Sequence, residues 1–266
     1  MTIDKICPIS NLLMQPLCRQ KILSKYEVDY FICTHCGLIQ TESPYWLDEA
    51  YENAISALDT GILHRNIRTR RYLEPMIEIL GLGQGTFADI GGGYGTLTRL
   101  MRDIGYDCHT HDIYCQNIFA KDFEVKPGTT YSALFSFEIL EHLPDPIQFI
   151  QEEFLKYSTR TLFFSTQTYN KIPDKNWWYY ACDSGQHISF YQQKTLSLLA
   201  KAVNCEYYCI SSSIHVITDR KIHKIRKYIL RHRWCFLLYS LITRLRRMKR
   251  TNIFPDHEAA KAKYRG

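Results

Sequence analysis

The segment Phe87–Asp112, FADIGGGYGTLTRLMRDIGYDCHTHD, decides the fold. It opens with a short apolar run that predicts a buried strand, and three successive glycines and a fourth two positions later follow that run. Beyond the glycines, apolar residues recur at the spacing of one helix face: Leu97, Leu100, Met101 and Ile104. Gly105 stands where a helix C-cap is expected. The segment therefore predicts a strand, a glycine-rich turn and a helix.

Strands and helices continue to alternate after this segment. The runs DCHTHD, YSALFSFE and TLFFST predict strands, and EYYCIS with IHVIT predicts a hairpin near the end of the sheet. Asp145 can cap a helix that begins at Pro146, and KTLSLLAKAV predicts another helix. Alternation of this kind predicts an α/β fold with a mostly parallel, doubly wound, Rossmann-like sheet.

The glycine turn is the first candidate binding site, because ligands of such sheets bind beyond the carboxyl ends of the strands. A dinucleotide fingerprint needs a third glycine where Thr96 stands, so NAD and FAD are disfavoured. The pattern that fits is Asp89-x-Gly91-x-Gly93-x-Gly95, with Asp112 at the end of the second strand. An ionised carboxylate only accepts hydrogen bonds, so the Asp112 carboxylate can take both hydroxyls of a ribose.

These residues resemble the first motif of the class I S-adenosylmethionine-dependent methyltransferases. The resemblance implies a seven-stranded methyltransferase sheet and S-adenosyl-L-methionine as the cofactor. It also implies cofactor contacts for Asp89, Gly91, Gly93 and Gly95 at the methionine and ribose, and for Asp112 at the ribose. The alternative is that the glycines only form a tight turn and that the acids cap helices.

Three polar side chains follow the strand YSALFSFE in the run SFEILEHLPDP: Glu138, Glu141 and His142. The run is similar to a segment of sugar methyltransferases and ubiquinone-pathway O-methyltransferases. Because a sulfonium methyl is already electrophilic, the enzyme mainly aligns the reactants and removes a proton from the acceptor. His142 is a candidate base with Glu141 as a catalytic neighbour, and Glu138 is a candidate to line the cofactor. His142 alternatively shapes the turn through a backbone hydrogen bond.

A long aromatic connection, 169–191, separates the strand TLFFST from the next helix. Connections of this length are often lids, and a packed hydrophobic cluster is the alternative. His187 lies in a run, HISFY, that also resembles sugar-type methyltransferases, so it is the second candidate base. Tyr180 is a candidate to hydrogen-bond an acceptor oxygen. The amino-methylating signature N/D-P-P-Y is absent, which disfavours N-methylation.

The first 45 residues contain four of the ten cysteines and short strand-like runs such as VDYFIC. Cys33 and Cys36 form a C-x-x-C-G knuckle, which suits a tetrahedral zinc ion. Cys7 begins a second knuckle whose other cysteine is replaced by Ser10, and Cys18 is a candidate for the fourth ligand. The whole is similar to the N-terminal zinc module of nucleotide-sugar C-methyltransferases, which carry a further C-terminal domain that is absent here. The alternatives are a remnant without metal and simple buried thiols.

The net charge of +6 is unevenly distributed, because residues 220–266 hold fifteen lysines and arginines against Asp256 and Glu258. The stretch Trp234–Ile242 is apolar and has basic residues on both sides, yet it is too short to span a bilayer. Residues 220–250 therefore predict a membrane-surface contact, self-association or core packing, and RNA binding is disfavoured by the acidic remainder of the chain.

The sequence divides into a zinc-ribbon-like module (1–45), a helical linker (46–82), a methyltransferase domain (83–219) and a basic helical tail (220–266). We expect transfer of a methyl group to a small polar acceptor of the nucleotide-linked sugar or glycan class. The alternatives are an RNA methyltransferase and a non-catalytic scaffold. The first ten residues lack the pattern of a secretory signal, so we expect a cytoplasmic protein, with the tail as a candidate peripheral contact to the inner membrane face.

Overall fold

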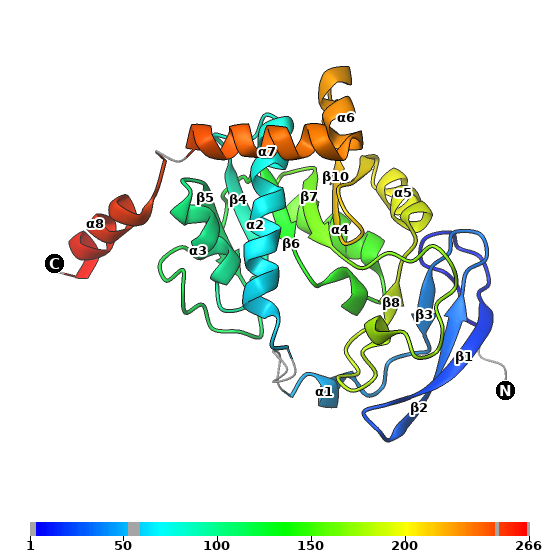
Figure 1. Cartoon of the computed structure of the whole chain (residues 1–266). Helices are drawn as coiled ribbons and strands as arrows, with labels where there is room; N and C mark the ends of the chain where they lie inside the picture. Colours follow the sequence, from blue (N-terminus) through cyan, green and yellow to red (C-terminus); the bar gives the residue numbers. More distant parts are fainter. Residues whose placement is uncertain (1–3, 53–58, 248–249, 265–266) are drawn as a thin grey trace. The chain divides into compact units, whose positions relative to one another are not determined.

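A computed structural model describes residues 4–52, 59–247 and 250–264. Six strands form a mixed sheet in the order β5-β4-β6-β7-β10-β9, and four form a second sheet in the order β1-β2-β3-β8 (Figure 1). The chain packs as two compact units. The first unit comprises residues 1–58, 137–156 and 164–219, and the second comprises residues 59–136, 157–163 and 220–266.

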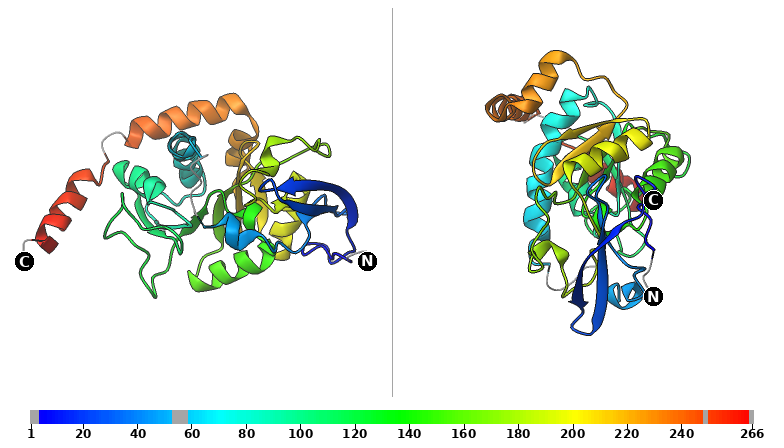
Figure 2. Two further views of the ribbon diagram at one scale, coloured as in Figure 1. Left: turned by 90° about the horizontal axis from the view of Figure 1, so that it is seen from below. Right: turned by 90° about the vertical axis from the view of Figure 1, so that its right-hand side faces the viewer.

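The second unit contains the segment that decides the fold. Its elements before the tail are α2 (Ile62–Ile79), β4 (Thr86–Ile90), α3 (Thr96–Asp103), β5 (Asp107–His111) and β6 (Ala133–Ser136). Strand β4 pairs in parallel with both β5 and β6, which confirms the expected strand, turn and helix order. The tail forms α6 (Lys224–Arg231), α7 (Arg233–Arg247) and α8 (Ile253–Tyr264). Helix α7 packs against α2, and Figure 2 shows it on the outer side of that helix.

The first unit contains the N-terminal strands and the later parts of the sheet. Its N-terminal elements are β1 (Gln15–Ile22), β2 (Tyr26–Ile32), β3 (Ile39–Thr41) and α1 (Leu47–Ala50). Further along the chain come η1 (Leu140–His142), α4 (Pro146–Lys156), η2 (Trp178–Tyr180), β8 (Ser189–Phe190), α5 (Gln193–Ala202), β9 (Glu206–Cys209) and β10 (Ile214–Thr218). Strand β7 (Thr161–Ser165) adjoins β6 and β10 in the larger sheet. The Asp145 carboxylate accepts the Gln148 amide at 2.9 Å, so the predicted cap of α4 is confirmed.

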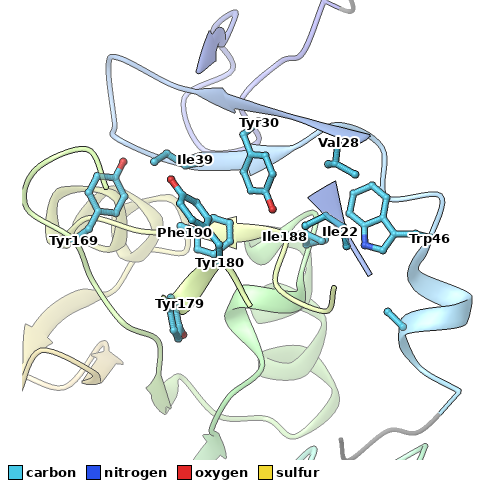
Figure 3. Packing of buried hydrophobic residues seen from close by; sticks show 11 residues of the cluster. Ile22, Val28, Tyr30, Ile39, Trp46, Tyr169, Tyr179, Tyr180, Ile188 and Phe190 are labelled. Carbon is cyan, nitrogen blue, oxygen red and sulfur yellow. The ribbon is translucent and has the colours of Figure 1, made fainter. Parts of the chain in front are cut away.

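Part of the aromatic connection packs in a hydrophobic cluster, as one of the two interpretations expected. Tyr169, Tyr180 and Phe190 pack in one buried cluster with Tyr30 and Trp46 of the N-terminal region (Figure 3). Strand β3 pairs with β8, so residues 39–41 share a sheet with residues 189–190. The expected domain ranges stay a prediction, because the compact units are built from interleaved segments.

The expected seven strands are not found among the described residues, where the larger sheet has six. Beside β5 there is a single parallel bridge between Thr110 and Glu124 instead of a further strand. Pro127 has no amide hydrogen to donate and Gly128 has a φ of 74°, so the run after Glu124 does not continue as a strand.

Within the described ranges, no helix combines the length and the apolar character needed to cross a membrane.

Candidate functional site

The glycine turn joins β4 to α3 and needs glycine for its backbone shape. The φ angles of Gly91, Gly93 and Gly95 are 66°, 57° and 79°, a region that residues with a Cβ rarely adopt. Gly91 donates its amide hydrogen to the His111 carbonyl at 2.7 Å, which ties the turn to the end of β5. The turn therefore presents backbone rather than side chains at the carboxyl ends of two parallel strands.

The Asp112 carboxylate points into this turn. Its Oδ2 accepts the Gly93 amide at 2.8 Å, and its Oδ1 accepts the Tyr114 and Cys115 amides, each at 2.8 Å. A carboxylate offers about four lone-pair sites, so roughly one remains for a ligand. The expected bidentate grip on a ribose would therefore require Asp112 to release a backbone amide, whereas one ribose hydroxyl fits the observed arrangement.

Asp89 lies beneath the turn, and its predicted cofactor contact stays a prediction. Its side chain is buried, and its Oδ2 accepts the Thr98 hydroxyl of α3 at 3.0 Å. Burial raises the pKa of Asp89 to about 7, the Thr98 hydrogen bond opposes that rise, and the nearby Asp112 charge adds to it. Asp89 therefore supports the turn from below, and any effect on a cofactor passes through the turn.

A cavity of about 480 Å³ opens beside Asp112. Its lining includes Gly93, Asp112, Asn117, Asp122 and Tyr264. A volume of this size is typical of small-molecule sites. Because it adjoins the glycine turn, it is the candidate place for the nucleoside end of a cofactor.

Tyr264 at this cavity was not predicted from the sequence. It belongs to α8, whose last turn reaches Asp122 through hydrogen bonds from the Lys263 ammonium and the Tyr264 hydroxyl. The start of α8 is held by Asp256, which accepts Arg102 Nη2 at 2.6 Å and Arg99 Nη1 at 2.9 Å. Asp256 is one of only two acidic residues in the basic tail. An acid in such a setting could have indicated that it pairs with basic residues elsewhere in the chain.

The candidate base residues form a second constellation, in the first unit. His142 and His187 lie with ring centroids 4.9 Å apart. His142 Nδ1 lies 2.9 Å from the Gln186 carbonyl oxygen, and His187 Nδ1 lies 2.8 Å from the Tyr179 carbonyl oxygen. A carbonyl only accepts, so both Nδ1 atoms carry the hydrogen, and in each neutral ring Nε2 holds the lone pair.

Glu141 completes this constellation together with Tyr179. Its side chain is buried, and its Oε1 accepts the Tyr179 hydroxyl at 2.7 Å. The enclosed position of His142 and the neighbouring His187 ring lower the pKa of His142 to about 3, so this imidazole is neutral near pH 7. One ligand atom from each of Glu141, His142 and His187 lies within 4.8 Å of the others, so the group could also hold a metal ion.

Tyr180, the predicted hydrogen-bonding tyrosine, lies elsewhere. It is buried in the aromatic cluster, where its ring meets the Tyr30 ring edge to face at 5.2 Å. Successive side chains of a 3₁₀ turn point about 120° apart, so in η2 Tyr179 reaches Glu141 while Tyr180 faces the cluster (Figure 3). The sequence pattern does not reveal which of the two adjacent tyrosine side chains points toward Glu141.

Glu138 has an unusual backbone conformation. Its φ is 58°, which is costly for a residue with a Cβ and is often found at functional sites. The Glu138 amide donates to Ser165 Oγ at 2.7 Å, and Ser165 Oγ donates to Glu138 Oε1 at 2.5 Å. The Glu138 carboxylate is thus held at the end of β7.

Three of the four predicted cysteine ligands come together. Cys7, Cys33 and Cys36 are buried and could jointly hold a metal ion, with the Cys7 and Cys36 sulfurs 3.5 Å apart. Cys18 lies in β1 opposite Tyr30, outside this group. Ser10 Oγ lies 3.2 Å from the Cys33 sulfur, because it occupies the knuckle position that a second cysteine would take.

Comparison with known proteins gives one family match. The model of a methyltransferase domain matches residues 64–210, more than half of the chain. Comparison with curated protein sequences gives no match.

Solved structures of similar fold include CalO1, a methyltransferase of calicheamicin biosynthesis, at 15% identity and a TM-score of 0.40 over 64% of this chain and 60% of that one. The mitomycin 7-O-methyltransferase MmcR matches at 12% identity and a TM-score of 0.44, over 65% of this chain and 59% of that one. Magnesium protoporphyrin IX methyltransferase from Synechocystis PCC 6803 matches at 12% identity and a TM-score of 0.36, over 65% of this chain and 90% of that one. The matches to the first two span about 60% of their length.

Proposed function

We propose, because the chain belongs to the methyltransferase family whose domain model it matches, that it transfers a methyl group from S-adenosylmethionine to a small polar hydroxylated molecule of the nucleotide-linked sugar or glycan class. The observation that carries the donor side is the Asp112 carboxylate, which is fixed on the glycine turn at the edge of a 480 Å³ cavity. The methyl donor would place its ribose at Asp112 and its sulfonium along the turn.

The acceptor side rests on the constellation of Glu141, His142 and His187. The imidazoles of His142 and His187 are the groups proposed to meet the acceptor hydroxyl, and the buried Glu141 carboxylate, which accepts the Tyr179 hydroxyl, is proposed to support them. We assign the proton transfer to His187 and acceptor orientation to His142, since a pKa of about 3 makes His142 a weak base.

Turnover with labelled donor tests the proposal. The protein is incubated with S-adenosylmethionine and a panel of sugar nucleotides and glycans, and products are detected by their added methyl mass. Methylated product is expected from at least one hydroxylated acceptor. Donor binding by calorimetry without transfer to any acceptor would favour a scaffold, and transfer only to RNA would replace the proposed acceptor class.

Two histidine variants separate the assigned roles. His187→Gln should lower kcat by about 10²-fold or more, whereas His142→Gln should mainly raise KM, because a base acts in the transition state and an orienting group acts in binding. Activity that is lost with a chelator and restored by a divalent ion, while the zinc content of the cysteine group stays unchanged, would show that the histidine group acts as a metal site instead. S-adenosylhomocysteine affinity is the control and should stay unchanged in both variants.

We further propose a structural zinc ion held by Cys7, Cys33 and Cys36 with the Ser10 hydroxyl at the fourth corner. The hydrogen bond between the two thiols lowers the pKa of Cys7 and raises that of Cys36, so the first thiolate forms readily and a bound zinc ion would supply the positive charge that the further thiolates need. Metal analysis of the purified protein should give close to one zinc per chain. Cys33→Ser should lose it, and Cys18→Ser, outside the group, should retain it.

A further inference from the structure

Helix α7 is turned with its apolar face outward. The side chains that face outward recur along one stripe and are strongly exposed: Trp234 80%, Leu238 62%, Leu241 54% and Leu245 59%. The opposite stripe is buried and polar apart from Phe236, with Ser240 6%, Thr243 4% and Arg247 5% exposed. A surface helix of a globular protein usually shows the reverse arrangement. The leucine stripe therefore contributes little to the packing of this helix.

The buried polar stripe makes its hydrogen bonds inside the second unit. Ser240 and Thr243 donate their hydroxyl hydrogens to carbonyls of their own helix, at 2.7 and 2.9 Å. Arg247 donates to Glu78 Oε1 and to the Gly83 carbonyl oxygen, both at 2.6 Å. Helix α7 is therefore held against the unit by the Arg244 and Arg247 ion pairs and by the stacking of Phe236 on Tyr72, and none of these contacts uses the leucine stripe.

Exposed basic residues flank the outward stripe on both sides in the sequence. Lys221, Lys224, Arg246 and Arg250 are exposed, and residues 220–250 contain no aspartate or glutamate. Exposed Ile225 and Tyr228 extend the apolar surface onto α6. A stripe of leucines with a tryptophan at one end and a cationic rim matches a helix that lies in the plane of an anionic membrane surface.

We propose that the outward face of α6 and α7 docks on a bilayer that contains anionic phospholipids. The leucines and Trp234 would enter the boundary between headgroups and acyl chains, and the basic rim would contact lipid phosphates. Pairing with a second copy through this face is disfavoured, because a two-fold interface would bring together two cationic surfaces without a carboxylate between them. Helix α7 lies on the bilayer and does not cross it.

Vesicle flotation tests this proposal with the full chain. Wild-type protein should float with vesicles of phosphatidylcholine and phosphatidylglycerol at 7:3 and stay in solution with phosphatidylcholine alone. Leu238→Gln with Leu241→Gln should weaken binding by roughly tenfold or more, because two buried apolar side chains are lost. The matched control is Leu155→Gln, since Leu155 of α4 is 84% exposed but lies outside this face, and it should bind as wild type.

Further readouts separate lipid docking from the alternatives. The unfolding midpoint of the double variant should equal that of wild type, because the changed side chains are exposed. Vesicles should shift the tryptophan emission to the blue, and Trp234→Phe should remove most of that shift. No binding to the anionic vesicles overturns the proposal. A wild-type dimer in sedimentation that the double variant abolishes would assign the face to self-association, and vesicle binding that persists in the double variant would assign it to another surface.

Discussion

At the scale of single residues, the glycines of the turn are needed for two different reasons, backbone conformation and space. Gly91, Gly93 and Gly95 are needed for their φ angles, but Gly92 is needed for space. A Cβ on Gly92 would lie 2.3 Å from Thr110 Oγ1 and 2.8 Å from Asp89 Oδ2. Both neighbours are buried, so neither moves away easily.

Gly92→Ala should therefore lower the free energy of unfolding by about 1–3 kcal/mol, measured by chemical denaturation. Adding Thr110→Ala should restore part of the loss, because it removes the nearer of the two atoms. Gly61→Ala is the control, since its Cβ would lie 3.0 Å from the flexible end of Arg65 and 3.9 Å from Asp59 Oδ1. Equal destabilisation by the two glycine substitutions would contradict the steric explanation.

Asp89 should give stability a pH dependence. Its folded pKa of about 7 lies above the value of about 3.9 for an unfolded aspartate, so between these values only the folded state keeps the proton. Stability should fall as the pH rises from about 4 to 7 and then level off, with a total change of up to about 4 kcal/mol. Denaturation of wild type and Asp89→Asn at pH 5 and pH 8 measures this. The same pH slope in both proteins would show that another group is responsible.

At the scale of elements, α8 is attached at both ends and delivers Tyr264 to the cavity beside Asp112. At its start, the Arg102 and Asp256 side chains are only 7% and 10% exposed. At its end, Lys263 and Tyr264 meet Asp122. A helix near the end of the chain thus completes a site whose other walls come from the turn after β5.

Tyr264→Ala should weaken S-adenosylhomocysteine binding about threefold to tenfold in calorimetry without changing the unfolding midpoint, because it removes one wall of the cavity. Asp256→Ala should weaken binding and also lower stability, since it leaves the largely buried Arg102 guanidinium with less compensation. Glu258→Ala on α8 is the control: its partner Lys261 is on the same helix, and both properties should stay unchanged. Unaltered binding in Tyr264→Ala would exclude α8 from the cofactor site.

At the scale of the whole molecule, the uneven charge distribution allows basic residues of the tail to pair with acids inside the second unit. Arg244 pairs with Glu74 at 3.1 Å, and Arg247 pairs with Glu78 at 2.6 Å, so acids of α2 bind basic residues of the tail. The Arg247 guanidinium also lies 3.7 Å from the centre of the Tyr106 ring. The tail is therefore part of the folded unit and not an appended extension.

Removing residues 220–266 should lower the melting temperature by at least about 5 °C, because it uncovers α2 and leaves Glu74 and Glu78 without these partners. Differential scanning fluorimetry measures the change. Removing only residues 252–266 keeps α7 and should lower the melting temperature by less than the longer truncation does. Equal melting temperatures for the full chain and the longer truncation would mean that the α7 contacts contribute nothing to stability.

The sequence by itself determined the α/β order, the glycine turn, the acid at the end of β5 and the cap of α4. These follow from local rules, because strand and helix periodicity, positive φ at glycine and capping depend on residues close together in the chain. The same rules brought His142 and His187 forward as candidates, since each stands in a short motif.

Only the tertiary structure decided which side chains meet. Cys18 lies apart from the other three thiols, and Tyr179 rather than Tyr180 lies beside Glu141. Asp89 lies under the turn, and Tyr264 lies at the cavity beside Asp112. The tertiary structure also turned the leucines of α7 outward, although the helical period alone predicts a buried apolar face. The physical reason is that each contact joins residues distant in sequence, and packing selects among orientations that local patterns leave equal in energy.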